Sequence, residues 1–265
     1  MCSSDLRGQF AVSHLEAPPT DLMGPAVSIA GVASFGRLSG SPTGRVNRLS
    51  QVTASVSHQR RGHAIRVGGD VLYNADRISF PRAIRGAYAF SSLANFLAGT
   101  YNNAGFTQTF GVTDVTQTNP NLGLYVQDEW NVRADLTLNL GVRHDLQALE
   151  TIRTDANNVS PRVGFAWSPQ TSSRTVVRGS AGVFYDRVPL RALANALLSA
   201  GNTTDVRELR QVGISLSPGQ AEAPVFPNLL PRPVPSVTLH NLTTMDRDLQ
   251  NASSRQVSLE VERQV

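Results

Sequence analysis

The stretch LGLYVQDEWNVRADLTLNLGVRHDL, residues 122–146, decides the fold of this chain. It holds two segments in which apolar and polar residues alternate, separated only by Arg133, Ala134 and Asp135. Successive side chains of a strand point to opposite faces, so each segment has one apolar face. These faces are formed by Leu122, Leu124, Val126, Trp130 and Val132, and by Leu136, Leu138, Leu140, Val142 and Leu146. Strands of about 10 residues with this pattern and a short turn are typical of a membrane-spanning β-barrel.

The alternation recurs in two more hairpins. Residues 52–57 and 63–73 flank a turn at residues 60–62, and residues 163–167 and 177–185 flank a polar turn at residues 169–173. Weaker patterns predict four more strands: one before the first hairpin, two between the first two hairpins and one at the end of the chain, namely residues 27–35, 84–90, 106–112 and 253–262. Short turns at one end and long polar loops at the other indicate a barrel whose short turns lie in the periplasm. Because strands alternate in direction, an even number of strands must separate the first two hairpins, and residues 84–90 and 106–112 supply two.

The sequence therefore predicts an all-β fold, an antiparallel up-and-down transmembrane β-barrel segment of roughly ten long strands with short periplasmic turns and long outer loops. Residues 1–25 are expected to be an unstructured or loop segment, and residues 26–265 a partial barrel domain with an outer loop excursion at 187–251. Residues 91–99 are expected to form a short helical turn. The segment PLRALANALLSA, residues 189–200, has helical spacing. That helix either lines a ligand vestibule or covers strand edges at the rim.

Composition excludes several classes of protein. All 24 basic residues are arginines, balanced by 20 acidic residues, and they are spread along the chain beside acids, which argues against a nucleic-acid partner. The single cysteine, Cys2, excludes a disulfide framework. No phosphate-binding glycine loop, nucleophile elbow or paired metal-ligating histidines occur, so we expect no enzyme, no cofactor and no metal site. No run of about 18 apolar residues predicts a membrane-spanning helix, and the first 25 residues lack the pattern of a secretory signal.

Four segments resemble successive strands of TonB-dependent outer-membrane receptors, in the order of that family. They are LGLYVQDEWNVRADLTLNLGVRHD (122–145), NNVSPRVGFAWSP (157–169), TVVRGSAGVFYDR (175–187) and SSRQVSLEVERQV (253–265). RRGHAIRVGGDVLYN (60–74) and FSSLANFLAG (90–99) resemble the preceding strand and connector. The similarity is greatest to the Oar-like subgroup and covers residues 26–265.

The resemblance implies a location in the bacterial outer membrane and a part in the uptake of a bulky nutrient. Receptors of this kind have a barrel of about 22 strands with a plugged lumen. Their partners are the membrane lipid, the plug domain, TonB and a nutrient that this sequence does not identify. Neither a plug nor a TonB-docking segment is recognisable, and residues 263–265 end in mid-strand without a terminal aromatic residue. We therefore expect an internal piece of a receptor barrel.

Two groups of residues are the site candidates. Charged residues on the polar faces are expected to face the lumen, where they either contact the plug or a ligand or form ion pairs that stiffen the wall. They are Arg143, Asp145, Arg162, Arg178 and Asp186. Trp130, Trp167 and Tyr185 lie near strand ends on the apolar faces and are expected to form interfacial aromatic girdles; the alternative is packing in a soluble core. His144 and Asp145 point to opposite faces and form no catalytic pair.

Three functions remain open from the sequence. The first is part of the barrel of a TonB-dependent transporter for a bulky nutrient such as an oligosaccharide, a peptide or a metal chelate. The second is a self-contained small outer-membrane barrel with a structural or adhesive role, which requires pairing of its first and last strands. The third is a secreted carbohydrate-binding β-sandwich, whose apolar faces would be covered by a second sheet.

Overall fold

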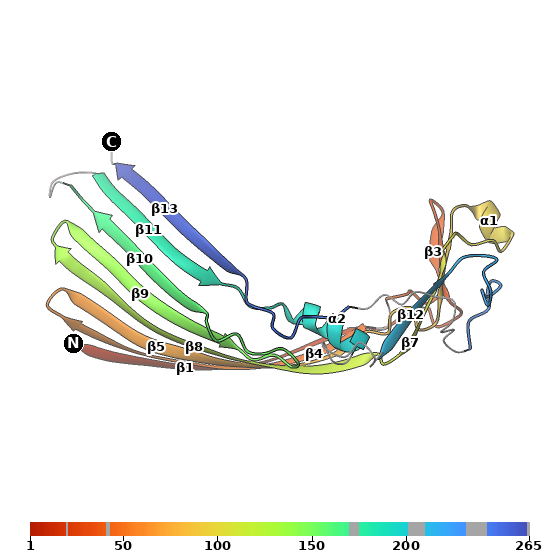
Figure 1. The fold of residues 1–265 in the computed structure, drawn as a ribbon, viewed down its shortest axis with the longest axis horizontal. Helices are drawn as coiled ribbons and strands as arrows, with labels where there is room; N and C mark the ends of the chain where they lie inside the picture. Colours follow the sequence, from red (N-terminus) through yellow and green to blue (C-terminus); the bar gives the residue numbers. More distant parts are fainter. Residues whose placement is uncertain (20, 41–42, 170–174, 201–209, 232–242, 264–265) are drawn as a thin grey trace.

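The computed structural model describes residues 1–19, 21–40, 43–169, 175–200, 210–231 and 243–263. These residues form two sheets (Figure 1). The larger is entirely antiparallel, with the strand order β1-β4-β5-β8-β9-β10-β11-β13. Its strands are β1 (Cys2–Ala17), β4 (Thr43–Arg60), β5 (His63–Ser79), β8 (Asp114–Arg133), β9 (Leu136–Gln147), β10 (Val159–Trp167), β11 (Thr175–Tyr185) and β13 (Ser253–Arg263). The strands follow one another in chain order, so the predicted all-β, up-and-down architecture is confirmed.

The predicted hairpins are present, and their register aligns the apolar faces of the two strands. In β8 and β9, Leu122 pairs with Leu146, Val126 with Val142 and Trp130 with Leu138, so apolar residues meet apolar residues. The turn between β4 and β5 has positive φ at both central residues, 48° at Arg61 and 83° at Gly62, as a two-residue type I′ hairpin requires. The third hairpin joins β10 to β11, and most of its predicted turn lies outside the described residues. The turns between β4 and β5 and between β8 and β9 lie at the end of the sheet where the chain begins (Figure 1).

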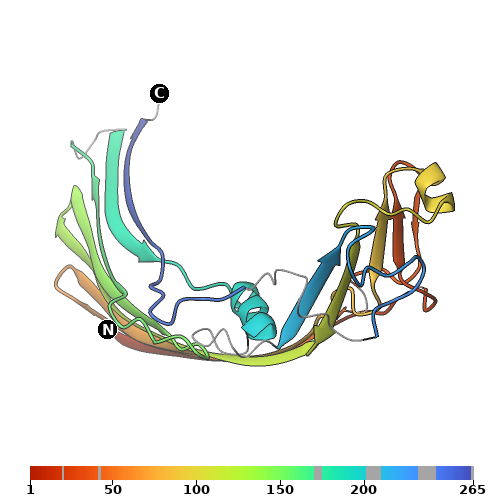
Figure 2. The same ribbon diagram turned by 45° about the vertical axis from the view of Figure 1, so that its right-hand side comes forward.

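The eight-stranded sheet is curved and its two faces differ chemically. Helix α2 (Leu190–Ala200) lies on the concave side (Figure 2). The Nε2 of Gln117 donates to the main-chain oxygen of Leu190 at 3.1 Å, which identifies the face of Gln117 as the concave one. The polar residues of the alternating pattern share this face. The apolar residues point to the convex side, where large side chains stay exposed, with exposed fractions of 84% for Val257, 73% for Leu259 and 70% for Phe10.

Residues 1–25 are not the loop segment that the sequence predicted. Residues Cys2–Ala17 form β1, which pairs with β4 along its whole length, Cys2 opposite His58 and Ala17 opposite Thr43. Leu6, Phe10 and Val12 occupy its convex face, interrupted by Gly8 and followed by His14. The alternation is therefore weak, and only pairing with β4 makes the strand evident.

Three predicted barrel segments belong to a second sheet. This five-stranded sheet has the order β12-β7-β6-β2-β3, with one parallel pair, β2 and β6. Its strands are β2 (Ala26–Ile29), β3 (Ala33–Phe35), β6 (Ala87–Phe90), β7 (Phe106–Gly111) and β12 (Gln211–Leu216). The barrel sheet thus contains eight strands instead of ten. The requirement for an even number of strands between the first two hairpins is still met, because β5 pairs directly with β8 and no strand of this sheet lies between them.

We call the second sheet, helix α1 (Leu93–Leu97) and residues 223–230 the outer lobe, because they lie opposite the short turns (Figure 1). The long connections after β1, β5 and β11 all contribute to it. Its core is aromatic: the rings of Tyr88 and Phe106 lie 4.8 Å apart, those of Tyr88 and Phe226 5.1 Å. Gln108 exchanges two hydrogen bonds with the main chain of Leu230, at 2.9 and 3.1 Å. The lobe is therefore a packed unit built from three loops.

Both predicted helices are present. Helix α1 begins after Ser92, whose hydroxyl oxygen accepts from the main-chain N–H of Asn95 and caps the helix. Helix α2 is held against the concave face: Leu193 and Leu197 are buried, and the side chain of Gln147 both donates to and accepts from the main chain of Val188 just before the helix. It covers the inner wall of the sheet instead of the strand edges. Within the described residues, neither helix has the length and apolarity needed to cross a membrane.

Candidate functional site

The concave face carries the charged residues that the sequence singled out. Arg143 and Asp145 project from β9, Arg162 from β10 and Arg178 from β11, while Asp186 follows β11 directly. Alternation along each strand places the first four on the face of Gln117. The main-chain N–H of Asp186 donates to the oxygen of Ala252 at 2.8 Å, and this residue is exposed.

Arg143 is the centre of an ion-pair network on this face. Its Nε and Nη2 donate to the carboxylate of Asp145 at 2.7 to 3.0 Å, and its Nη2 also donates to Oδ1 of Asp70 on β5 at 2.8 Å. Gly123 pairs with both Asp70 and Asp145 and lies between them. A Cβ at Gly123 would collide with the Arg143 guanidinium and lie 2.8 Å from Oδ1 of Asp70. The glycine thus lets Arg143 lie flat across β8 and link three strands.

A second network joins the outer part of the wall to α2. The carboxylate of Asp76 is fully buried and accepts from Nε and Nη2 of Arg45 at 2.8 and 3.0 Å. Gln117, which is also buried, donates to Asp76 at 3.2 Å and to the oxygen of Leu190. Sequence reasoning missed Asp70 and Asp76, although their position on the polar face of 63–79 was a usable signal. Asp76 is paired by Arg45 of β4 and Gln117 of β8, two neighbouring strands whose register with β5 periodicity does not give.

The other two arginines of the wall have different surroundings. Arg178 forms an ion pair with Glu262 of β13. Both side chains are about half exposed, so the pair contributes little to stability. The guanidinium of Arg162 lies over the ring of Phe184, 4.6 Å from its centroid, and no ion pair engages it within the part of the chain that is described. Ion pairing, one of the two predicted roles, is thus present at Arg143, Asp145 and Arg178 and does not extend to Arg162.

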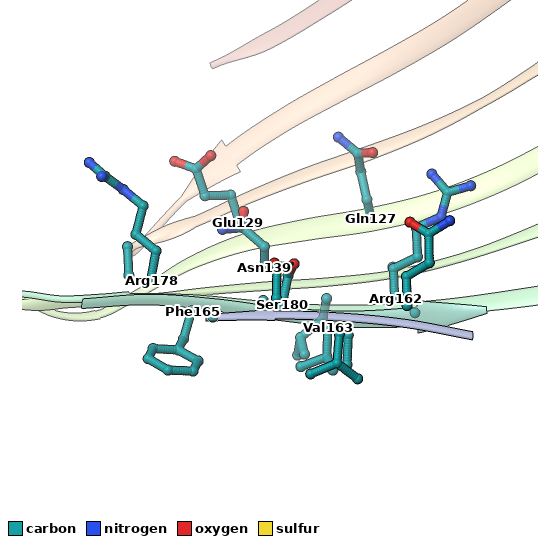
Figure 3. Close-up of a pocket in the computed structure, with 18 of the residues that line it drawn as sticks. Gln127, Glu129, Asn139, Arg162, Val163, Phe165, Arg178 and Ser180 are labelled. Carbon is teal, nitrogen blue, oxygen red and sulfur yellow. Dashed lines mark hydrogen bonds between the residues drawn. The ribbon is translucent and has the colours of Figure 1, made fainter. Parts of the chain in front are cut away.

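A wide hollow of about 750 Å³ lies against the sheet from β8 to β13. Figure 3 shows Gln127, Glu129, Asn139, Arg162, Arg178 and Ser180 projecting from one side of the strands, while Val163 and Phe165 point to the other. Gly141, Gly164 and Gly182 line the hollow and add no side chain to its polar side, which leaves room there. Amide, carboxylate, guanidinium and hydroxyl groups share this surface, and it suits a polar solute.

A smaller cavity of about 220 Å³ is bordered by Arg143, Asp145, Arg162, Tyr185, Arg187 and Asn251, among others. Three arginines thus converge there from β9, β10 and the segment after β11. Sequence reasoning did not single out Arg187, since it lies beyond the alternating pattern of β11, and only the fold brings it beside Arg143 and Arg162.

The three aromatic residues expected in girdles lie near strand ends. Trp167 ends β10 opposite Leu136, and Trp130 lies three residues before the end of β8. The ring of Trp130 stacks on His63 at 5.1 Å, and Nδ1 of His63 lies 2.6 Å from the carboxylate of Asp128. Tyr185 ends β11 at the opposite end of the sheet and borders the smaller cavity. No second sheet covers the convex face within the described residues; the girdle role itself stays a prediction.

Known proteins resemble this chain in sequence and in fold. The TonB-dependent transporter Oar of Myxococcus xanthus is 27% identical over 239 residues, which cover 77% of this chain and 22% of the relative. The outer membrane transporter YddB from Escherichia coli has a TM-score of 0.57 and 14% identity, covering 99% of this chain and 30% of that protein. The siderophore receptor PirA from Acinetobacter baumannii gives a TM-score of 0.48 and 10% identity, again over 99% and 30%.

This chain thus spans less than a third of each of these proteins. The likeness to YddB supports the fold, in agreement with the two-faced sheet described above. A family model described as an outer membrane beta barrel domain matches residues 3–154 and 148–265, which is nearly the whole chain. The chain therefore belongs to this family of outer-membrane β-barrel proteins.

Proposed function

We propose that this chain forms part of the barrel wall of a TonB-dependent transporter that takes up a bulky nutrient across the bacterial outer membrane. The observation that carries the proposal is the sheet with two chemically different faces, because its exposed convex side suits hydrocarbon and its polar concave side suits a water-filled conduit. The 27% identity to the TonB-dependent transporter Oar supports the transport role. The plug domain and TonB are the partners that this role requires.

The outer lobe and the concave wall have different parts in this proposal. The lobe lies on the side of the long loops, where a solute arrives, and it presents a rigid surface because its core is packed. The wide hollow on the wall offers amide, hydroxyl and charged groups to a solute that passes. An oligosaccharide, a peptide or a metal chelate all match this mixed polar chemistry.

The other two candidate functions have less support. A self-contained small barrel requires β1 to pair with β13, but these strands form opposite edges of the sheet. A secreted sandwich requires a second sheet over Phe10, Val126 and Leu259, and the convex face carries none in the part of the chain that is described.

Growth assays test the transport role directly. Cells with and without the gene for the protein that contains these residues are grown on limiting maltodextrins, on limiting peptides and on ferric chelates. We expect a growth advantage on one of the three, lost when TonB is deleted, because passage through a plugged barrel requires energy. Equal growth on all three would contradict the proposal, and an advantage that survives loss of TonB would point to a passive pore.

A further inference from the structure

The smaller cavity has an unusual surplus of positive charge. Arg143, Arg162 and Arg187 border it, together with a single carboxylate, Asp145. Asp145 is committed to Arg143, which also binds Asp70 outside the cavity. Arg143 is therefore compensated twice, whereas Arg162 and Arg187 have no ion pair among the described residues.

Two further acids adjoin residues of the cavity, and neither forms an ion pair with Arg162 or Arg187 among the described residues. Asp186 precedes Arg187 in the chain but does not border the cavity. Asp155 accepts a hydrogen bond from the main-chain N–H of Asn251 at 3.0 Å. No described acid forms an ion pair with Arg162 or Arg187, and both residues are exposed, so two cationic groups remain accessible to an anion from solution, which they would bind with charge-assisted hydrogen bonds.

The guanidinium of Arg162 is oriented for binding. It lies over the ring of Phe184. Gly182, which pairs with Arg162 across the strands, lets the two side chains pack closely, because a Cβ there would lie 3.2 Å from the ring and 3.3 Å from Cγ of Arg162. The ring covers one face of the guanidinium, and its N–H groups form no ion pair with any residue that the structure describes. A guanidinium fixed in this way loses little entropy when it binds an oxyanion with two parallel hydrogen bonds.

Register explains why the arginines meet. Arg162 pairs with Gly141, and Arg143 pairs with Ser160, so the two arginines are diagonal neighbours on adjacent strands. Such neighbours lie about 7–8 Å apart at the backbone, within reach of long side chains. Arg143 is fixed by its carboxylates and forms one wall, and Arg187 approaches from the segment after β11.

We propose that this cavity is a subsite for an anionic group, a carboxylate or a phosphate, carried by a solute that enters from the side of the long loops, with Arg162 and Arg187 as the binding residues. The inference rests on the proposed function for the origin of the solute and narrows it to an acidic one. Arg143 and Asp145 are positioning residues that shape the wall. A neutral solute forms only the weaker hydrogen bonds to these two guanidinium groups, which no described residue pairs.

Binding to the purified protein that contains these residues, solubilised in detergent micelles, tests the site. Citrate, inorganic phosphate and glucose are titrated calorimetrically against the native chain and against Arg162→Gln and Arg187→Gln. We expect citrate or phosphate to bind, glucose not to bind, and each variant to weaken anion binding roughly tenfold or more, because a charge-assisted hydrogen bond is lost. Arg178→Gln is the matched control: it removes one arginine from the same wall but from a residue paired with Glu262, and binding should persist.

The outcomes separate this inference from the transport role. If anion binding is equal in the native chain and in both cavity variants, or falls equally in Arg178→Gln, the inference is wrong. The interpretation of the growth assays does not depend on that result. Loss of binding in the cavity variants with no TonB-dependent growth advantage would instead retain the site and contradict the transport role. If the variants lower the stability of the protein without changing citrate or phosphate binding, the arginines compensate a carboxylate of the protein itself. That result would overturn the solute subsite.

Discussion

The eight-stranded sheet and the outer lobe place their apolar residues in opposite ways. In the sheet, Val126, Leu259 and Phe10 are exposed on the convex face and the polar residues are inside. In the lobe, Tyr88 and Phe106 are buried, with exposed fractions of 1% and 0%. One chain therefore contains a sheet whose outer surface suits hydrocarbon and a lobe whose outer surface suits water. Hydrophobic residues stabilise the first only when lipid is present, but stabilise the second in water.

Among the changes that test the difference between the two regions, truncation of a residue in the lobe core should have the largest effect on stability. Phe106→Ala removes a fully buried ring that contacts Tyr88 and Tyr101, and such truncations cost about 3–5 kcal/mol. We expect the lobe to lose amide-exchange protection while the barrel sheet keeps it. Phe10→Ala, on the exposed convex face of β1, is the control and should leave lobe protection unchanged. Equal loss of protection in both regions would show that the lobe is not a separate core.

A charge on the convex face should destabilise the sheet next most strongly. Val126→Arg places a guanidinium on the face assigned to lipid, at a cost of about 2–4 kcal/mol near the bilayer midplane. Gln127→Arg changes the adjacent residue on the polar face and should cost little. Unfolding by guanidinium in phospholipid vesicles measures both. Similar losses for the two variants would contradict the assignment of the faces.

The glycine beneath Arg143 offers a smaller, local test. Gly123→Ala introduces a Cβ where the guanidinium now lies, so the link from Arg143 to Asp70 must break. We expect a loss of about 1–3 kcal/mol in unfolding free energy, as for other disrupted charged hydrogen bonds. At Gly164, on the same face, an added Cβ meets nothing closer than 3.4 Å, so Gly164→Ala is the control. If Gly123→Ala and Gly164→Ala have the same free energy of unfolding, the space at Gly123 is not what fixes Arg143.

Alkaline pH should loosen the lobe before the sheet, with the smallest effect of the four. Burial raises the pKa of the Tyr88 phenol, with a further rise from Tyr101, and burial also raises the pKa of Tyr101. The folded lobe then keeps protons that the unfolded chain releases above its ordinary pKa of about 10. Its stability is therefore complete below that pH and falls as the pH rises past it. Hydrogen exchange as a function of pH measures this.

Tyr88→Phe sharpens the alkaline test. It removes one titrating group and the hydrogen bond to the oxygen of Asn228, at a cost of about 1 kcal/mol at neutral pH. The decline of lobe stability with rising pH should become shallower in this variant. An unchanged pH dependence would exclude Tyr88 as its source.

The hairpins were predictable because each has many alternations. In residues 122–146 the pattern predicted the two strands and their turn, and the structure pairs Val126 with Val142 across them. In β2 and β3, strands of four and three residues provide too few alternations to distinguish a short lobe strand from a membrane strand. Strand β1 was missed because Gly8 and His14 interrupt its apolar face and no turn joins it tightly to β4.

The candidate site was predictable in part. Alternation assigned Arg143, Asp145, Arg162 and Arg178 to one face, and the structure keeps them there. The partners of Arg143 were not predictable: Asp70 is 73 residues away in the chain and meets it only because β5 lies beside β8. Arg187 likewise borders the smaller cavity only because the fold brings it beside Arg143 and Arg162.

The sequence by itself determined which side of each long strand is apolar, where the tight turns fall and in which direction the strands run, because these properties depend on neighbours along the chain. Only the tertiary structure decided that β5 pairs with β8 across 34 residues of loop, that three loops share one aromatic core, and which carboxylate compensates which arginine. Register between strands far apart in the chain sets these contacts, and it depends on the packing of whole elements, which residue periodicity does not encode.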